Sequence, residues 1–252
     1  MRNLFPQNLP FTLIIVVLAM LGSSCSTQSR YIEEGLDKVI KQNREVSNFT
    51  VLLYDMDYAQ GKYLHQYQVL TMEPDSTFEE NTTDWLEVSP RFFKAHQDHL
   101  GMELASKENG KLEKETAPAG YSQYVGNPQY GRWVDRGGSS FWEFYGKYAM
   151  LNAIFNMGGR PARYSYWDTY NRDYRGRGSV YYGPSRYYGT TSYVNNTNKG
   201  KQSAWGKKPS SFKQSVRNRV SRSSSTSSRT SRSSSRYSGS STRSRSRGGF
   251  GK

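Results

Sequence analysis

The sequence is poor in the residues that build large cores, disulfides and metal sites. Only 35% of its 252 residues are hydrophobic, and this count includes 20 Tyr, whereas typical globular proteins reach roughly 45–50%. A single core through the whole chain is therefore not expected. The chain has one Cys and three His, so an intrachain disulfide is excluded and an all-His metal site would need every histidine.

Acidic residues are missing from the C-terminal part of the chain. Residues 26–120 hold 10 basic and 17 acidic side chains, residues 121–198 hold 9 and 4, and residues 199–252 hold 15 and none. The formal net charge of +14 therefore belongs to the second half of the chain. This asymmetry predicts an acidic domain followed by a cationic tail with anionic partners.

The N-terminus has the pattern of an export signal. Arg2 precedes an apolar run from Phe11 to Leu21, which fits a signal-peptide core and is shorter than the about 20 residues that span a bilayer. Small residues then lead to the single cysteine, in the order Leu21-Gly22-Ser23-Ser24-Cys25.

This segment resembles the lipobox of bacterial lipoproteins, although Gly22 stands where an aliphatic residue is usual. The resemblance implies that residues 1–24 are a signal peptide, that Cys25 carries lipid, and that residues 25–29 form a tether. Several acyl chains would hold the protein firmly to a membrane. A plain secretory signal with an incidental Cys and an uncleaved N-terminal anchor are the alternatives.

Residues 30–117 have the pattern of a small α+β domain. Apolar spacing, the Ser89-Pro90 helix start and the Asn109-Gly110 turn predict two helices and five strands. The predicted helices are Tyr31–Val46 and the segment from Pro90 to Gly101, and the predicted strands are Asn48–Asp57, Lys62–Met72, Thr83–Val88, Met102–Ser106 and Leu112–Thr116. This order favours a small antiparallel sheet with one or two packed helices.

Catalytic signals in this domain are few. His96 and His99 are three residues apart on the predicted helix, close enough for one metal ion, with His65 or Asp98 as a conceivable third ligand. Two histidines on a solvated helix face are the commoner arrangement. We therefore expect no cofactor and no enzymatic activity, and an enzyme that uses His96 and His99 is the minor alternative. The sequence has neither a glycine-rich phosphate loop nor a serine nucleophile elbow.

Two acidic residues lie near the end of the first predicted strand. Asp55 and Asp57 alternate with Met56, so both are expected on one face of the strand. Paired carboxylates serve in some acid–base and metal sites. A strand end that faces water is the simpler interpretation.

Residues 118–159 form a segment rich in Tyr and Trp. A Ser140-x-x-Glu143 capping box and Gly158-Gly159 predict an isolated helix over 141–157, apolar on nearly every side. Such a helix must be buried against the α+β domain, against a second copy, or at a membrane surface.

Residues 160–198 are an Arg/Tyr/Gly-rich segment of low complexity. Arg and aromatic planes together stack on bases or sugars. The alternative is a poorly folded linker whose Arg and Tyr side chains contact each other.

Residues 199–252 are expected to be a disordered basic tail, because low hydrophobicity and like charge prevent the formation of a core. The tail resembles the Ser/Arg segments of RNA-processing proteins, and its end, Arg247-Gly248-Gly249-Phe250-Gly251, resembles an RGG box. The candidate polyanion-binding residues are Arg217, Arg219, Arg222, Arg229, Arg232, Arg236, Arg243, Arg245 and Arg247.

Taken with the lipobox and the tail, the stretches Tyr124–Gly131 and Phe141–Tyr148 make the chain similar to uncharacterised bacterial envelope lipoproteins. That family supplies no catalytic residues. The resemblance implies a membrane-anchored protein of the bacterial cell envelope whose basic tail contacts anionic envelope polymers, anionic lipids or a partner. The alternative is a nucleic-acid-binding protein that uses the Arg/Tyr and Ser/Arg segments.

Overall fold

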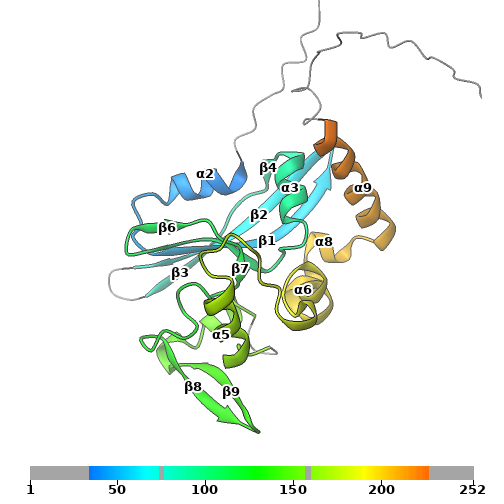
Figure 1. Ribbon diagram of the computed structural model, residues 1–252. Coiled ribbons are helices and arrows are strands. Elements are labelled where there is room, and N and C mark those ends of the chain that lie inside the picture. The colour runs from blue at the N-terminus through cyan, green and yellow to red at the C-terminus, as the bar shows by residue number, and fades with distance from the viewer. Residues whose placement is uncertain (1–33, 74–76, 157–159, 227–252) are drawn as a thin grey trace, which may run out of the picture. The chain divides into compact units, whose positions relative to one another are not determined.

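The computed structural model describes residues 34–73, 77–156 and 160–226 (Figure 1). The chain divides into two compact units, Met1–Ile32 and Glu33–Lys252. The first unit contains the predicted signal peptide and Cys25, which lie outside the described residues. The described part of the second unit combines an antiparallel sheet with several helices, so the prediction of an α+β fold is confirmed.

In the described part of the chain, the main sheet has seven strands, all paired antiparallel. Its path runs β3-β2-β1-β5-β6, with β4 also paired to β2 and β7 to β5. The strands are β1 (Phe49–Ala59), β2 (Lys62–Met72), β3 (Phe78–Thr82), β4 (Leu86–Val88), β5 (Met102–Glu108), β6 (Lys111–Glu113) and β7 (Ala117–Pro118). Two hairpins form in this sheet, β1–β2 around Gln60-Gly61 and β5–β6 around the predicted Asn109-Gly110 turn, and these four turn residues have positive φ.

Helices from both halves of the chain pack on one face of the sheet. They are α2 (Gly35–Gln42), α3 (Pro90–His96), α8 (Ala204–Lys207) and α9 (Ser210–Thr226). Phe49, Val51 and Leu53 alternate along β1 toward this face and join Phe93 of α3 and Trp205 of α8 in the first core. The predicted start of α3 is confirmed, because the Phe92 N–H donates to Ser89 Oγ at 3.1 Å and Pro90 opens the helix.

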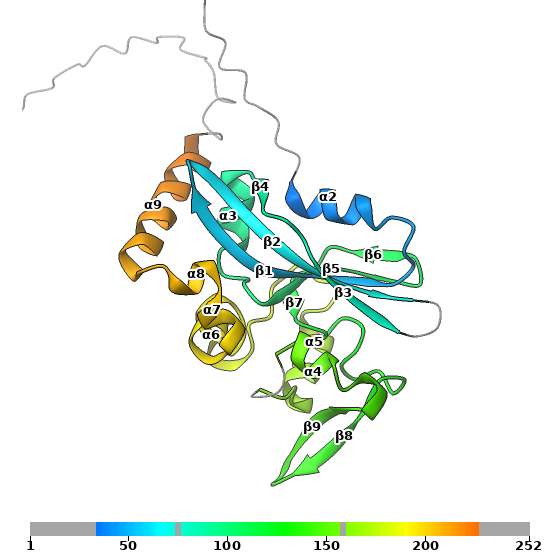
Figure 2. The same ribbon diagram turned by 180° about the vertical axis from the view of Figure 1, so that it is seen from behind.

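The opposite face of the sheet is covered by an aromatic second core. The segments that build it lie below the sheet in Figure 2, on the side away from α2 and α3. Leu52 and Leu70 point from the sheet into it and meet buried aromatic side chains that follow β7, such as Tyr121 and Tyr124. The elements on this side are β8 (Gly131–Arg136), β9 (Ser139–Phe144), the 3₁₀ turn η1 (Gly146–Tyr148), α4 (Leu151–Ile154) and α5 (Tyr164–Asp173). The central strands are therefore buried on both faces.

The prediction of a single helix over 141–157 is wrong. Its first residues belong to β9, which pairs with β8 across Gly137-Gly138, two glycines with positive φ. Trp142 and Phe144 are buried with the period of two that a strand requires. A helical turn and the short α4 follow, and Met157 lies outside the described residues.

Order extends far past the predicted beginning of disorder at Lys199. The segment 160–198 forms α5, the 3₁₀ turn η2 (Pro184–Arg186) and α6 (Thr190–Asn196), and α7 (Asn198–Gln202), α8 and α9 follow. Phe212, Val216 and Val220 recur every fourth residue, so one face of α9 is apolar and packs into the first core. The prediction of disorder is therefore wrong for residues 199–226, while residues 227–252 lie outside the described residues.

Candidate functional site

The structure brings all three histidines of the chain into one cluster beneath α3. His96 Nδ1 and His99 Nδ1 are 3.0 Å apart, so one nitrogen donates and the other accepts. His99 Nε2 lies 2.7 Å from the Tyr182 hydroxyl, and His65 Nδ1 lies 3.2 Å from the Tyr67 hydroxyl. His96, His99 and Tyr182 therefore form a hydrogen-bonded chain that joins α3 to the segment before η2.

Burial determines the charge of this cluster. It lowers the pKa of His96 to about 3 and that of His99 to about 4, so both rings are neutral at neutral pH. Within the described ranges, no group of three or more His, Cys, Asp or Glu side chains is arranged to hold a metal ion. The two Nδ1 atoms bond each other, and His65 and Asp98 do not complete a ligand set with them.

The two acidic residues at the end of β1 have separate roles. Asp55 is only 5% exposed, and its carboxylate accepts hydrogen bonds from the N–H groups of Ala204 at 2.6 Å and Trp205 at 3.2 Å. Asp57 forms an ion pair with Lys208 at 3.2 Å. The interpretation of a strand end facing water is therefore wrong for Asp55, which holds the first turn of α8.

Three of the nine candidate polyanion-binding arginines lie in α9. Arg217 pairs with Asp98 at 3.2 Å, and Arg219 lies 5.3 Å from the ring centre of Tyr58 and donates to its hydroxyl at 3.2 Å. Arg222 is exposed and lies one turn further along α9. The others lie outside the described residues, namely Arg229, Arg232, Arg236, Arg243, Arg245 and Arg247.

The helices α7, α8 and α9 form an acid-free basic surface. Residues 199–226 contain eight Lys and Arg and no Asp or Glu. Lys201, Lys207, Arg219 and Arg222 are exposed, and we call these four side chains the C-terminal basic surface. Burial together with the nearby positive charge of Arg217 lowers the pKa of Lys213.

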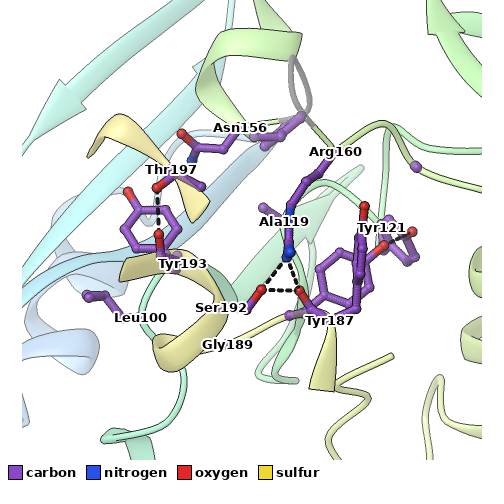
Figure 3. A pocket seen from close by; sticks show the side chains of 14 residues that line it. Leu100, Ala119, Tyr121, Asn156, Arg160, Tyr187, Gly189, Ser192, Tyr193 and Thr197 are labelled. Atoms are coloured by element: carbon purple, nitrogen blue, oxygen red, sulfur yellow. Dashed lines mark hydrogen bonds between the residues drawn. The ribbon is translucent and has the colours of Figure 1, made fainter. Parts of the chain in front are cut away.

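A small cavity lies where α6 meets the aromatic second core (Figure 3). Its volume is about 50 Å³, and aromatic rings form much of its wall, those of Tyr121, Phe155, Tyr187, Tyr188 and Tyr193. The hydroxyls of Tyr121 and Tyr188 are hydrogen-bonded to each other. Burial raises the pKa of both phenols, so they stay neutral.

Two glycines allow the chain to approach closely around this cavity. A Cβ at Gly101 would lie 2.2 Å from the Tyr193 ring, and a Cβ at Gly189 would lie 2.6 Å from the Asp98 carbonyl oxygen. Both glycines have positive φ, which side-chain-bearing residues rarely adopt. Position and conformation therefore both require glycine here.

Arg160 stands at the mouth of the cavity. Its guanidinium lies 4.2 Å from the ring centre of Tyr187, and its Nη1 donates to the Tyr187 carbonyl oxygen at 2.6 Å and to the Ser192 hydroxyl (Figure 3). Arg160 also lines a polar cleft of about 540 Å³, which η2 and α6 border. The same guanidinium thus faces an aromatic cavity and a polar cleft.

A buried carboxylic acid, Glu103, lies on β5. Glu103 is fully buried, its Oε2 accepts from the Gly120 N–H at 3.2 Å, and its Oε1 has no hydrogen-bond partner among the residues that the structure describes. Burial raises the pKa of Glu103 to about 7, against the opposing effect of the neighbouring Ser122 hydroxyl. Ser122 and Arg175 line the adjacent pocket of about 130 Å³.

No protein-family model, no curated protein and no solved structure matches this chain. None of the helices within 34–73, 77–156 and 160–226 is long and apolar enough to cross a membrane.

Sequence reasoning missed Arg160 and Glu103 as site residues. Glu103 lies between Met102 and Leu104 in a strand that was predicted, and only the burial of both sheet faces places its side chain in a core. Arg160 lies in a segment whose composition indicates a linker. The sequence signal that could have indicated this site is the run of Tyr and Gly around Tyr187, whose residues form part of the cavity wall.

Proposed function

We propose that the protein is a non-enzymatic lipoprotein of the bacterial envelope, anchored through Cys25, that binds anionic polymers or lipids through its C-terminal basic residues. The observation that carries the proposal is the C-terminal basic surface, four exposed cations in a folded region that contains no acid. Each Lys or Arg near an anionic surface contributes about 1 kcal/mol, and the contribution decays over a Debye length.

The fold supports this role in a specific way. α9 is fixed to the first core through Val216 and Val220, so its exposed arginines are held on a rigid helix. The acidic residues of the first half of the chain hold part of this basic segment in place, as the Asp98–Arg217 and Asp57–Lys208 pairs do. The four side chains of the C-terminal basic surface nevertheless remain exposed to solvent.

Vesicle binding tests the proposal directly. The full-length protein is mixed with vesicles of phosphatidylcholine alone or with added phosphatidylglycerol, and the bound fraction is measured by co-sedimentation across a salt series. We expect binding to the anionic vesicles only, falling steeply with salt. Changing Lys201, Lys207, Arg219 and Arg222 to Gln should weaken binding by about fivefold for each charge removed.

A matched control removes the same charge elsewhere. Lys62, Arg91, Lys111 and Lys114 lie in the acidic half, and their change to Gln should leave vesicle binding unchanged. Equal loss in both variants would show that net charge alone governs binding. Salt-independent retention would also contradict the proposal.

The anchor has its own test. Labelled palmitate should enter the full-length protein and should not enter Cys25→Ala. Equal labelling of both would contradict the lipoprotein assignment and leave the basic surface to be judged by the vesicle experiment.

Nucleic-acid binding is the second proposal, and the geometry supports it less. The alternating Arg and Tyr side chains of residues 160–198 contact each other in several places, as in the pairs Arg160–Tyr187, Arg163–Tyr166 and Arg186–Tyr182. These planes are engaged within the protein. Tight binding of single-stranded RNA, lost with the same four Gln changes, would favour this function.

A further inference from the structure

The cavity is lined by the Arg160 guanidinium, which forms no ion pair within the described part of the chain. Asp98, an acid in the adjoining cleft, is paired with Arg186 at 3.9 Å and Arg217 at 3.2 Å. Among the described residues, no carboxylate forms an ion pair with Arg160, and the wall of the cavity has no acidic side chain. A half-buried charge of this kind is normally compensated.

The free face of this guanidinium has the geometry of a carboxylate receptor. Nη1 is used by the Tyr187 carbonyl oxygen and the Ser192 hydroxyl. Nη2 and Nε make no hydrogen bond within the described residues, and together they form one edge of a planar fork. Such an edge binds the two oxygens of a carboxylate side by side.

The scaffold holds this fork in place. The guanidinium is stacked on Tyr187, and the Ser192 hydroxyl that receives its hydrogen bond itself donates to the Tyr187 carbonyl oxygen at 2.6 Å. Asn196 fixes the same turn through its side-chain N–H, which donates to the Ser192 carbonyl oxygen at 2.9 Å. A ligand therefore meets an arginine that is already oriented, which reduces the entropy lost on binding.

Arg160 lines both the inner cavity and the outer cleft, and these two spaces indicate which chemical groups the rest of the ligand carries. The inner cavity of about 50 Å³ is walled by rings and alanines such as Ala119 and Ala162, so it suits a methyl-sized apolar group. The outer cleft is lined by Thr191, Asn195 and other polar side chains, which suit an amide. Arg160 and Arg186 outnumber Asp98 in the lining of this cleft, so the cleft favours an anion over a cation.

We propose that this cavity and cleft bind the terminal carboxylate of a peptide that ends in a small apolar residue, with Arg160 as the carboxylate receptor. The terminal methyl group lies against the rings, and the preceding amide lies in the polar cleft. This site is separate from the C-terminal basic surface, and it does not depend on the lipid anchor.

The test uses the acid and the amide of one probe. N-acetyl-Ala-Ala and its C-terminal amide differ only in the carboxylate, and binding to the full-length protein is followed by calorimetry and by ligand-observed NMR. We expect the acid to bind at least about tenfold more tightly than the amide. Equal affinity, or no binding of the acid, would overturn the proposal.

Arginine variants locate the site. Arg160→Gln should lose at least about tenfold in affinity for the acid, and Arg160→Lys should be nearly as weak because Lys lacks the planar fork. Arg163→Gln is the matched control, since Arg163 stacks on Phe141 and Tyr166 and does not line the cavity. Thermal melts establish that each variant is folded, and the comparison of acid with amide tests the proposal on the unmodified protein.

A competition experiment defines the ligand class. Inorganic phosphate at the same concentration offers an anion without an apolar group or an amide, so we expect it to displace the peptide acid weakly. Phosphate that binds more tightly than the peptide acid would overturn the assignment of a carboxylate ligand. Loss of binding in Arg163→Gln equal to that in Arg160→Gln would overturn the location.

Discussion

The Asp55 carboxylate on β1 receives the main-chain N–H of Ala204, 149 positions later in the chain, at 2.6 Å. It also receives the Trp205 N–H, and Trp205 is among the largest fully buried side chains of the structure. This contact fixes the beginning of α8 on the sheet. One acidic side chain from the first half of the protein therefore determines where the basic second half is attached.

Removing this carboxylate should destabilise the protein. Asp55→Ala leaves two main-chain N–H groups of α8 without an acceptor, and we expect a loss of about 2–3 kcal/mol in the free energy of unfolding. Asp55→Asn keeps one acceptor oxygen and should lose less. Urea unfolding measures both variants, and hydrogen exchange should show faster exchange in 204–223.

Asp57→Asn is the control for this change. Asp57 pairs with Lys208 nearer the surface, and such pairs contribute about 0–1 kcal/mol. If Asp55→Ala is no more destabilising than Asp57→Asn, the attachment of α8 does not depend on Asp55.

The position of truncation should decide whether the protein folds. A chain that ends at Asn198 lacks Trp205, Val216 and Val220, three side chains buried in the first core. We expect it to be unfolded or aggregated, because loss of each large core side chain costs about 2–5 kcal/mol. A chain that ends at Thr226 keeps all of them and should show a cooperative thermal transition by circular dichroism. Equal transitions in the two chains would contradict the packing of α8 and α9.

The histidine cluster predicts a pH dependence of stability. Burial holds the pKa of His96 at about 3 and that of His99 at about 4, below the value of about 6.5 in an unfolded chain. The unfolded state therefore binds protons first as the pH falls, so stability is full above pH 6.5 and decreases below it. The decrease is up to about 1.4 kcal/mol per pH unit for each histidine.

Urea unfolding at several pH values between 7 and 5 measures this slope. The double variant His96→Gln with His99→Gln should show a shallower slope, because its folded and unfolded states differ less in bound protons. The Glu103→Gln variant removes the opposite contribution of Glu103. If the stability of this variant stays constant from pH 7 to pH 5, the burial of neutral imidazoles is contradicted.

The buried Glu103 predicts a pH dependence of stability with the opposite sign to that of the histidines. Its pKa of about 7 is above the usual value of 4.5, so the folded state holds a proton that the unfolded state has released between these two pH values. Stability is therefore lost as the pH rises from 4.5 to 7. Glu103→Gln replaces the acid with a neutral group and should stabilise the protein by about 3 kcal/mol at pH 8 and little at pH 4.5.

The exposed Glu108 at the end of the same strand supplies the control, since Glu108→Gln removes a carboxyl group that is not buried. Unfolding at both pH values compares the two variants. A Glu103→Gln protein whose stability does not rise relative to Glu108→Gln at pH 8 would show that Glu103 is stabilised by contacts other than its proton.

The sequence predicts the local elements of the first half well. The β1–β2 hairpin follows from β-forming residues on either side of Gln60-Gly61, and the start of α3 follows from Ser89-Pro90. These signals act over a few residues, so the chain carries them regardless of its tertiary context.

The errors arise where tertiary packing overrides a local pattern. Ser140-x-x-Glu143 satisfies a capping rule, but Trp142 pairs with Trp133 across the hairpin, and the turn at Gly137-Gly138 was the competing signal. In α9, Ser and Arg residues separate the apolar residues that recur at every fourth position. The composition of the segment therefore indicates disorder, whereas the spacing of its apolar residues indicates a helix that packs on one face. A composition average hides a stripe of three residues such as Phe212, Val216 and Val220.

The candidate site is predictable only in part. His96 and His99 were found by their spacing, and the structure brings them together as hydrogen-bonded neighbours. Arg160 reaches its cavity through Tyr187 and Ser192, which are 27 and 32 positions away. A relation over that distance has no periodic signature in the sequence.

The attachment of α8 and α9 to the sheet also governs when the protein can fold. During synthesis the β1–β2 hairpin emerges early, yet the indole that closes over it is translated 150 positions after Asp55. Until then one sheet face stays open, and contacts of such long range form slowly. The nascent chain can therefore complete its first core only after α8 and α9 have been made.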